Sequence, residues 1–131
     1  MTNELILLKE DVQLLTSYIK GGNYLNLFDQ KNAEKLKEEL TKGTVLSKEE
    51  FPLDVIRLNS TVTIQDHRTG KLINLMLVLP EKAAINDGKV SVLAPIGTAL
   101  IGYRKGQTVN WKMPAGEKMY KVMEVVNEAF A

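Results

Sequence analysis

The stretch SVLAPIGTALIGYRKGQTVNWKMPAG, from Ser91 to Gly116, decides how this chain folds, because four glycines and two prolines interrupt its apolar residues. Pro95 has the fixed backbone angle that suits a first helical position, and Gly102 fits a helix C-terminus. We therefore expect a short apolar helix that crosses a sheet, in which the glycines serve the backbone. The glycine spacing lacks the lysine followed by serine or threonine that a phosphate-binding loop requires.

The residues around this stretch alternate between apolar and polar side chains, which is typical of strands. Residues 61–66 and 71–79 form an expected hairpin about the turn HRTG, with the second strand buried. The turn NDGK precedes an expected strand at 90–93. Strands at 109–111 and 118–126 then form a last hairpin about PAG.

The first 43 residues follow a helical period instead. Apolar residues recur at alternating spacings of three and four at Leu5, Leu8, Val12, Leu15 and Ile19. A second helix is expected from Asp29 as N-cap to Gly43, with its apolar face at Ala33, Leu36 and Leu40. The pattern predicts a short antiparallel helical hairpin whose two arms pack against each other. Residues 4–8 can alternatively be extended, because ELILL is too short to decide.

Composition narrows the class of protein. A chain of 131 residues with 44% hydrophobic and 25% charged residues is typical of one soluble globular unit. No apolar run approaches the roughly 18 residues of a membrane span, and the N-terminus lacks the basic region of a signal peptide. We therefore expect a cytoplasmic protein without a membrane partner.

Several chemistries are disfavoured by the residue inventory. The absence of cysteine and the single histidine, His67, argue against thiol chemistry and against a histidine or cysteine metal site, so we expect no cofactor. A net charge of +1 without a basic stripe argues against direct sequence-specific binding of nucleic acid. His67 is expected in an exposed turn, and Trp111 is expected in the core.

Three segments together resemble a known family. The segments SKEEFPLDVIRLNSTVTIQD, LAPIGTALIGYRKGQ and the turn containing MPAG are similar to the C-terminal domain of the GreA/GreB transcription elongation factors, over roughly residues 47–126. Within that family they most resemble the Rnk branch, the regulators of nucleoside diphosphate kinase. The resemblance implies an α+β fold with two parts. Residues 1–46 would form a short N-terminal antiparallel helical hairpin, or coiled coil, and residues 47–131 an FKBP-like bent antiparallel sheet with one short helix.

The resemblance also implies a partner, bacterial RNA polymerase. In the family, the globular domain docks at the rim of the secondary channel and the hairpin points inward. The hairpin tip of the cleavage factors carries a pair of carboxylates that help to hold a second magnesium ion. Here the tip GGNYLNLFD offers only Asp29, and both arms are short. We therefore expect a regulator, not an enzyme, that occupies the channel without stimulating transcript cleavage.

The candidate partner-binding residues fall into two groups. The first is the corner at the start of the short helix, formed by Ala94, Pro95, Ile96 and Gly97, which can serve as scaffold, as contact surface or as both. The second is at the hairpin tip, where Tyr24 and Leu25 can either cap the hairpin or grip a partner, beside Asp29. One departure concerns the corner: the family often has polar or acidic residues before the proline, whereas this chain has Leu93 and Ala94.

Two other function classes stay open. An FKBP-like fold suggests a prolyl isomerase, although the few aromatic residues are spread along the chain and make such a pocket hard to assemble. The apolar seam of the first helix suggests a dimeric coiled-coil interaction module, although packing within one chain, and hence a monomer, is the expected arrangement. The sequence leaves open whether transcription is activated or inhibited, and whether any link to nucleoside diphosphate kinase is direct.

Overall fold

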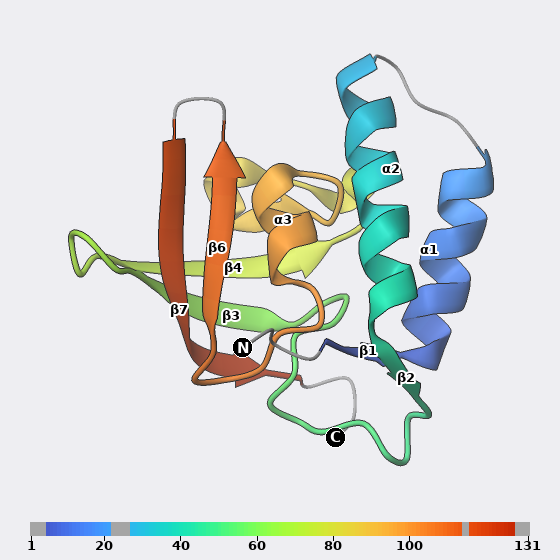
Figure 1. Cartoon of the computed structure of the whole chain (residues 1–131), viewed down its shortest axis with the longest axis horizontal. Helices are drawn as coiled ribbons and strands as arrows, with labels where there is room; N and C mark the ends of the chain where they lie inside the picture. The colour runs from blue at the N-terminus through green and yellow to red at the C-terminus, as the bar shows by residue number, and fades with distance from the viewer. Residues whose placement is uncertain (1–4, 22–26, 114–115, 128–131) are drawn as a thin grey trace.

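Two helices stand side by side next to a five-stranded sheet, and a short third helix lies between them and the sheet (Figure 1). The computed structural model describes residues 5–21, 27–113 and 116–127. The helices are α1 (Lys9–Gly21), α2 (Leu27–Lys42) and α3 (Pro95–Leu100). The chain is thus an α+β protein, as the sequence predicts.

The main sheet has the strand order β5-β4-β3-β7-β6. Its strands are β3 (Thr61–Asp66), β4 (Leu72–Val78), β5 (Lys89–Ser91), β6 (Thr108–Met113) and β7 (Gly116–Val126). The expected hairpin β3–β4 is confirmed, and its turn is closed by the carboxylate of Asp66, which accepts the N–H groups of Arg68 and Thr69 at 2.8 and 3.2 Å. The pair β6–β7 is antiparallel as expected, but residues 114–115 of its turn lie outside the described residues.

Two expectations for the sheet need correction. The sheet is not wholly antiparallel, because β5 runs parallel to β4. Parallel neighbours need a crossover, and the chain makes it through the two 3-10 turns η1 (Pro80–Lys82) and η2 (Ile85–Asp87). The strand β4 is buried only toward its C-terminal end, since Leu72 at its start is 56% exposed.

A second, two-stranded sheet lies at the base of the helices, where β1 (Ile6–Leu8) pairs in parallel with β2 (Thr44–Leu46). Residues 6–8 are therefore extended, which settles the alternative left open by the sequence. Leu5 and Leu8 do not belong to the helical seam, so that part of the prediction is wrong. Backbone pairing decides this, because Ile6 N–H donates to Gly102 O at 3.1 Å and Thr44 N–H donates to Leu5 O at 2.8 Å.

The start of the second helix also differs from the expectation. The helix α2 begins at Leu27, so Asp29 is its third residue and not its N-cap. A carboxylate is favoured both at the N-cap and within the first turn, because both positions lie near unpaired N–H groups and the positive end of the helix dipole. The predicted end before Gly43 is confirmed, since α2 ends at Lys42.

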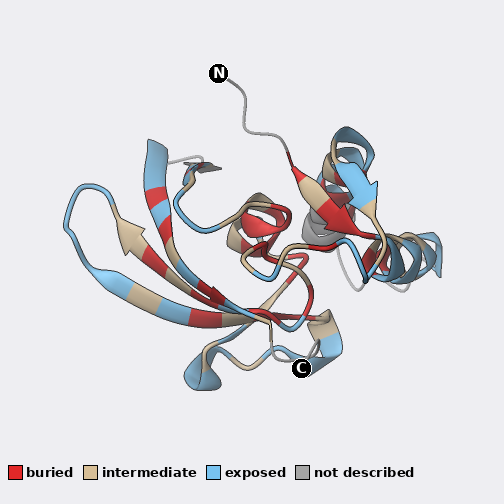
Figure 2. Cartoon of the chain, turned by 90° about the horizontal axis from the view of Figure 1, so that it is seen from below, coloured by how far each residue is buried: buried red, intermediate tan, exposed pale blue. Residues whose placement is uncertain are grey.

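The short helix α3 lies against the concave side of the sheet, where the buried residues of the strands face it (Figure 2). It begins at Pro95 and ends at Leu100, as predicted. Gly102 follows the C-cap residue with φ of 89°, and a Cβ there would lie 3.2 Å from Leu5 Cβ. This glycine therefore serves both the helix end and the close approach of residues 5–7.

One cluster of buried side chains joins the helices and the sheet. It includes Leu15 of α1, Leu36 and Leu40 of α2, Leu100 of α3 and Leu77 of β4. The apolar seam of the two long helices is therefore used within the chain. The division into residues 1–46 and 47–131 stays a prediction.

A buried carboxylate connects α1 to the segment before β3. Asp11, in the first turn of α1, is 5% exposed. Its Oδ2 accepts the N–H of Leu58 at 2.9 Å and Arg57 Nε at 3.4 Å, and its Oδ1 lies 3.3 Å from Arg57 Nη2. We refer to Asp11, Arg57 and Leu58 as the Asp11 joint.

Truncation of the leucine that ends α3 tests the core. Leu100→Ala removes a side chain that is 0% exposed and should lower the free energy of unfolding by about 2 to 5 kcal/mol. Urea unfolding followed by the fluorescence of Trp111 measures this. A loss below about 1 kcal/mol would show that α3 is not packed as described.

The pKa of Asp11 gives a second test. Burial raises the pKa of this carboxyl above its ordinary value of 3.8, and the bonds from Arg57 and Leu58 only partly offset it. Folding therefore takes up a proton between the unfolded and the folded pKa, so this group makes the protein less stable as the pH rises through that interval. Relative to Asp11→Asn, the wild type should gain stability as the pH falls from neutral to about 4. The opposite slope in urea unfolding would contradict the account.

Candidate partner-binding site

The candidate site is the corner between β5 and α3, formed by residues 94–97. Two hydrogen bonds close the turn that leads into it, from Leu93 N–H to Ser91 Oγ and from Ala94 N–H to Ser91 O, both at 3.0 Å. Thr98 N–H then donates to Ala94 O at 2.9 Å, which starts the helix. The backbone of the corner is thus fixed by its own hydrogen bonds.

Gly97 allows α3 to approach the end of β5 very closely. A Cβ on Gly97 would lie 2.2 Å from the carbonyl oxygen of Ser91 and 3.0 Å from Leu77 Cδ1. The next residue, Thr98, is 3% exposed and donates its hydroxyl to Val92 O at 2.8 Å. These contacts make Gly97 and Thr98 scaffold residues that hold the corner in place.

Pro95 and Ile96 form the accessible part of the corner. Pro95 is exposed at the first position of α3, and Ile96 is half-buried. Ile96 also borders an open hollow of about 270 Å³. The lining residues of this hollow carry no charge: Ile64, Ile73, Asn74, Leu75, Ile85, Gly88, Val90, Ile96, Trp111 and Tyr120.

Two aromatic residues meet in the wall of this hollow. The rings of Trp111 and Tyr120 lie with their centroids 6.0 Å apart at 37°. Trp111 is half-buried against the core, and its Nε1 is a buried donor that finds no acceptor among the described residues. The sequence predicts aromatic residues spread along the chain, whereas the hairpin β6–β7 places Val109 of β6 opposite Tyr120. A sequence signal for the contact between Trp111 and Tyr120 was available. Side chains of a strand alternate between its two faces, so positions 109 and 111 lie on one face.

The candidate residues at the helix tip are described less fully. Tyr24 and Leu25 lie outside the described residues, and of Asp29 only the backbone position in α2 is described. The role of these three residues in partner binding therefore stays a prediction.

Two charged residues that follow α3 form surface ion pairs. Arg104 Nη2 lies 2.9 Å from Asp54 Oδ1, with both side chains 41% exposed, and Lys105 Nζ lies 3.3 Å from Glu124 Oε2. His67 is exposed in the turn after β3, as predicted. Among the described residues, no three acidic or histidine side chains gather where they could hold a metal ion, and no helix is long and apolar enough to cross a membrane.

The fold and the sequence together define the family. The family described as transcription elongation factor GreA/GreB, C-terminal, matches residues 51–127, which include the Asp11 joint's Arg57 and Leu58 and the whole corner. The chain belongs to this family.

Individual relatives agree with this assignment. The regulator of nucleoside diphosphate kinase of Escherichia coli (strain K12) is 37% identical over 84 residues, which are 64% of this chain and 62% of the relative. The transcription elongation factor GreA of Syntrophomonas wolfei is 31% identical over 90 residues, 69% of this chain and 57% of the relative. The chain thus matches about three fifths of the length of these curated relatives.

A solved structure extends the likeness to the helices. The prokaryotic transcription elongation factor GreA/GreB from Nitrosomonas europaea matches 96% of this chain and 100% of its own, with a TM-score of 0.74 and 26% identity. The order and arrangement of helices and sheet are therefore those of a GreA/GreB factor.

Two substitutions at the corner should behave differently. Gly97→Ala places a methyl group against the Ser91 carbonyl and should lower the free energy of unfolding by about 1 to 3 kcal/mol or more. Pro95→Ala removes an exposed ring and should lower it by only about 0.4 to 1 kcal/mol, through added freedom of the unfolded chain. Urea unfolding of both variants measures the difference, and equal losses would contradict the geometry of the corner.

Proposed function

We propose that this chain is a transcription regulator that binds bacterial RNA polymerase at the rim of its secondary channel. The binding surface would be the corner of Ala94, Pro95, Ile96 and Gly97. The observation that carries the proposal is an exposed proline on a hydrogen-bonded corner beside an uncharged hollow. A fixed apolar surface loses little conformational entropy on binding, which favours association with another protein. Membership of a family named for transcription elongation factors supports polymerase as the partner.

The helix pair would point into the channel without stimulating transcript cleavage. Cleavage of the transcript needs several oxygen ligands around a second magnesium ion, and the tip segment of this chain has one carboxylate, Asp29. Tyr24 and Leu25 would contact the channel wall. A protein that occupies the channel in this way competes with factors that stimulate cleavage.

The remaining parts of the proposal follow from this role. The chain acts in the cytoplasm, where the polymerase is, and acts as a monomer, since the apolar seam of its long helices is buried within the chain. We propose no enzymatic activity at this hollow, because it is lined by no charged residue that can serve as acid or base. Any effect on nucleoside diphosphate kinase would be indirect, through transcription. The FKBP-like character of the sheet that curves around α3 is also part of this proposal.

Competition binding tests the proposal. Wild-type protein should displace a labelled cleavage factor from bacterial core RNA polymerase at micromolar concentration. Pro95→Ala and Ile96→Lys should each weaken this displacement by about tenfold or more, equivalent to ~1.4 kcal/mol, because both change the accessible part of the corner.

The control is Glu49→Ala, which changes an exposed side chain in the turn after β2 and should displace the factor as the wild type does. Retained folding of each variant is checked by urea unfolding. If the wild type fails to displace the factor, or if both corner variants displace it unchanged, polymerase binding through this corner is wrong.

A further inference from the structure

The contacts of the Asp11 joint continue into the sheet through one short turn. The backbone of Arg57 to Ser60 turns sharply, with Arg57 N–H bound to Ser60 Oγ at 2.8 Å and Ser60 N–H bound to Arg57 O at 3.1 Å. Asn59 takes φ of 70° within this turn and donates its N–H to Leu77 O at 2.6 Å. The turn is thus tied to β4.

The same turn is tied to the end of β7. The hydroxyl of Ser60, which is 0% exposed, donates to Asn127 Oδ1. The amide group of Asn127 donates in turn to Leu53 O at 2.9 Å and to Val55 O at 2.7 Å. A continuous series of hydrogen bonds therefore runs from α1 through the turn to two strands of the sheet.

We infer that Asp11 is a positioning residue, which fixes the orientation of the two long helices relative to the sheet through its contacts with Arg57 and Leu58. Apolar side chains such as Leu15, Leu36 and Leu40 also join the helices to the sheet, and the backbone bond from Ile6 N–H to Gly102 O ties β1, just before α1, to the end of α3. Apolar burial has little directional preference, so it holds the helices against the sheet without selecting one angle.

Hydrogen bonds to a buried charge are directional. The side chains of Asp11 and Arg57 are 7% and 13% exposed, so a rotation of α1 away from the turn would leave a charge without its partner and away from water. Only one orientation satisfies the carboxylate. A buried ion pair of this kind adds little to stability, but it can select one arrangement among several with similar apolar burial.

The orientation matters for the proposed function, on which this part of the inference rests. A helix pair that enters a channel must leave the docked sheet at a fixed angle. The Asp11 joint lies at the base of α1, next to β1 and β2, so a small change of angle there moves the far end of the helices by a large distance (Figure 1).

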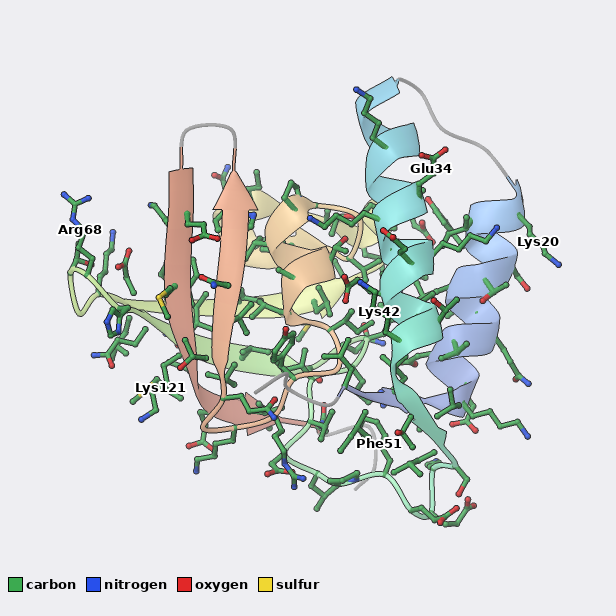
Figure 3. All side chains as sticks on the ribbon, viewed as in Figure 1. Lys20, Glu34, Lys42, Phe51, Arg68 and Lys121 are labelled. Carbon is green, nitrogen blue, oxygen red and sulfur yellow. The ribbon has the colours of Figure 1, made fainter. Side chains whose placement is uncertain are left out.

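Distance measurement between two spin labels tests the inference directly. The chain has no cysteine, so Glu34→Cys on α2 and Lys121→Cys on β7 give two specific labelling sites on exposed residues. Figure 3 shows these two residues on separate sides of the molecule. Pulsed electron paramagnetic resonance on the free protein should give a single narrow distribution of distances between the two spin labels.

Two variants in this labelled background separate the orientation of the helices from the stability of the fold. Asp11→Asn keeps an acceptor for Leu58 but removes the charge, and the double variant Asp11→Leu with Arg57→Met replaces the pair with apolar side chains. Both should lose the single population and give a broad or split distribution. The double variant should nevertheless be as stable as the wild type, or more stable, in urea unfolding monitored at Trp111. If Asp11 only stabilised the fold, every variant that broadens the distance distribution would also lower the free energy of unfolding.

The matched control is Asp54→Asn, which breaks the other aspartate–arginine pair of the chain's described part, with Arg104. That pair joins the segment before β3 to the segment after α3, so the distance distribution should stay narrow. An unchanged narrow distribution in both Asp11 variants would overturn the inference, since packing alone would then set the angle. The proposal of polymerase binding is tested separately, by the competition assay with wild-type protein that carries no spin label. That assay can contradict polymerase binding whatever the distance measurement shows.

Discussion

The buried carboxylate of Asp11 is the interaction on which the arrangement of this molecule depends. It lies 46 residues from Arg57 in the sequence, and its bonds to Arg57 and Leu58 join the first turn of α1 to the segment that enters the sheet. Burial raises its pKa, so the carboxylate is not a source of great stability. The carboxylate is important because its hydrogen bonds to Arg57 and Leu58 can form in only one position of the helix pair.

The corner at Pro95 depends on a different kind of constraint. Gly97 brings the first turn of α3 against the Ser91 carbonyl, at a distance that no side chain permits. The buried hydroxyl of Thr98 then holds the helix to Val92. Together these contacts present Pro95 and Ile96 on a backbone that has little freedom left. The corner and the Asp11 joint thus fix the two surfaces that the proposed polymerase complex would use.

Local signals in the sequence predicted much of this fold. The sequence predicted α3 from the proline at its first position and the glycine that follows its end. It predicted the hairpin of β3 and β4 from the turn HRTG.

Contacts between distant residues decided what the sequence did not predict. The strand β1 forms because β2 and Gly102 offer backbone partners, and β5 is parallel because of its crossover. The Asp11 joint, and the meeting of Trp111 with Tyr120, likewise need tertiary contacts. Pro95 and Ile96 were proposed from sequence as contacts and stay a prediction.

We expect the helix pair and the sheet to form one rigid body in the free protein. Residual dipolar couplings of the backbone N–H groups of α1, α2 and the five main strands test this most directly. All these couplings should fit a single alignment tensor for the arrangement of helices and sheet in this structure. Two different tensors, one for the helices and one for the sheet, would contradict it, because the Asp11 joint would then not hold the two parts at one angle.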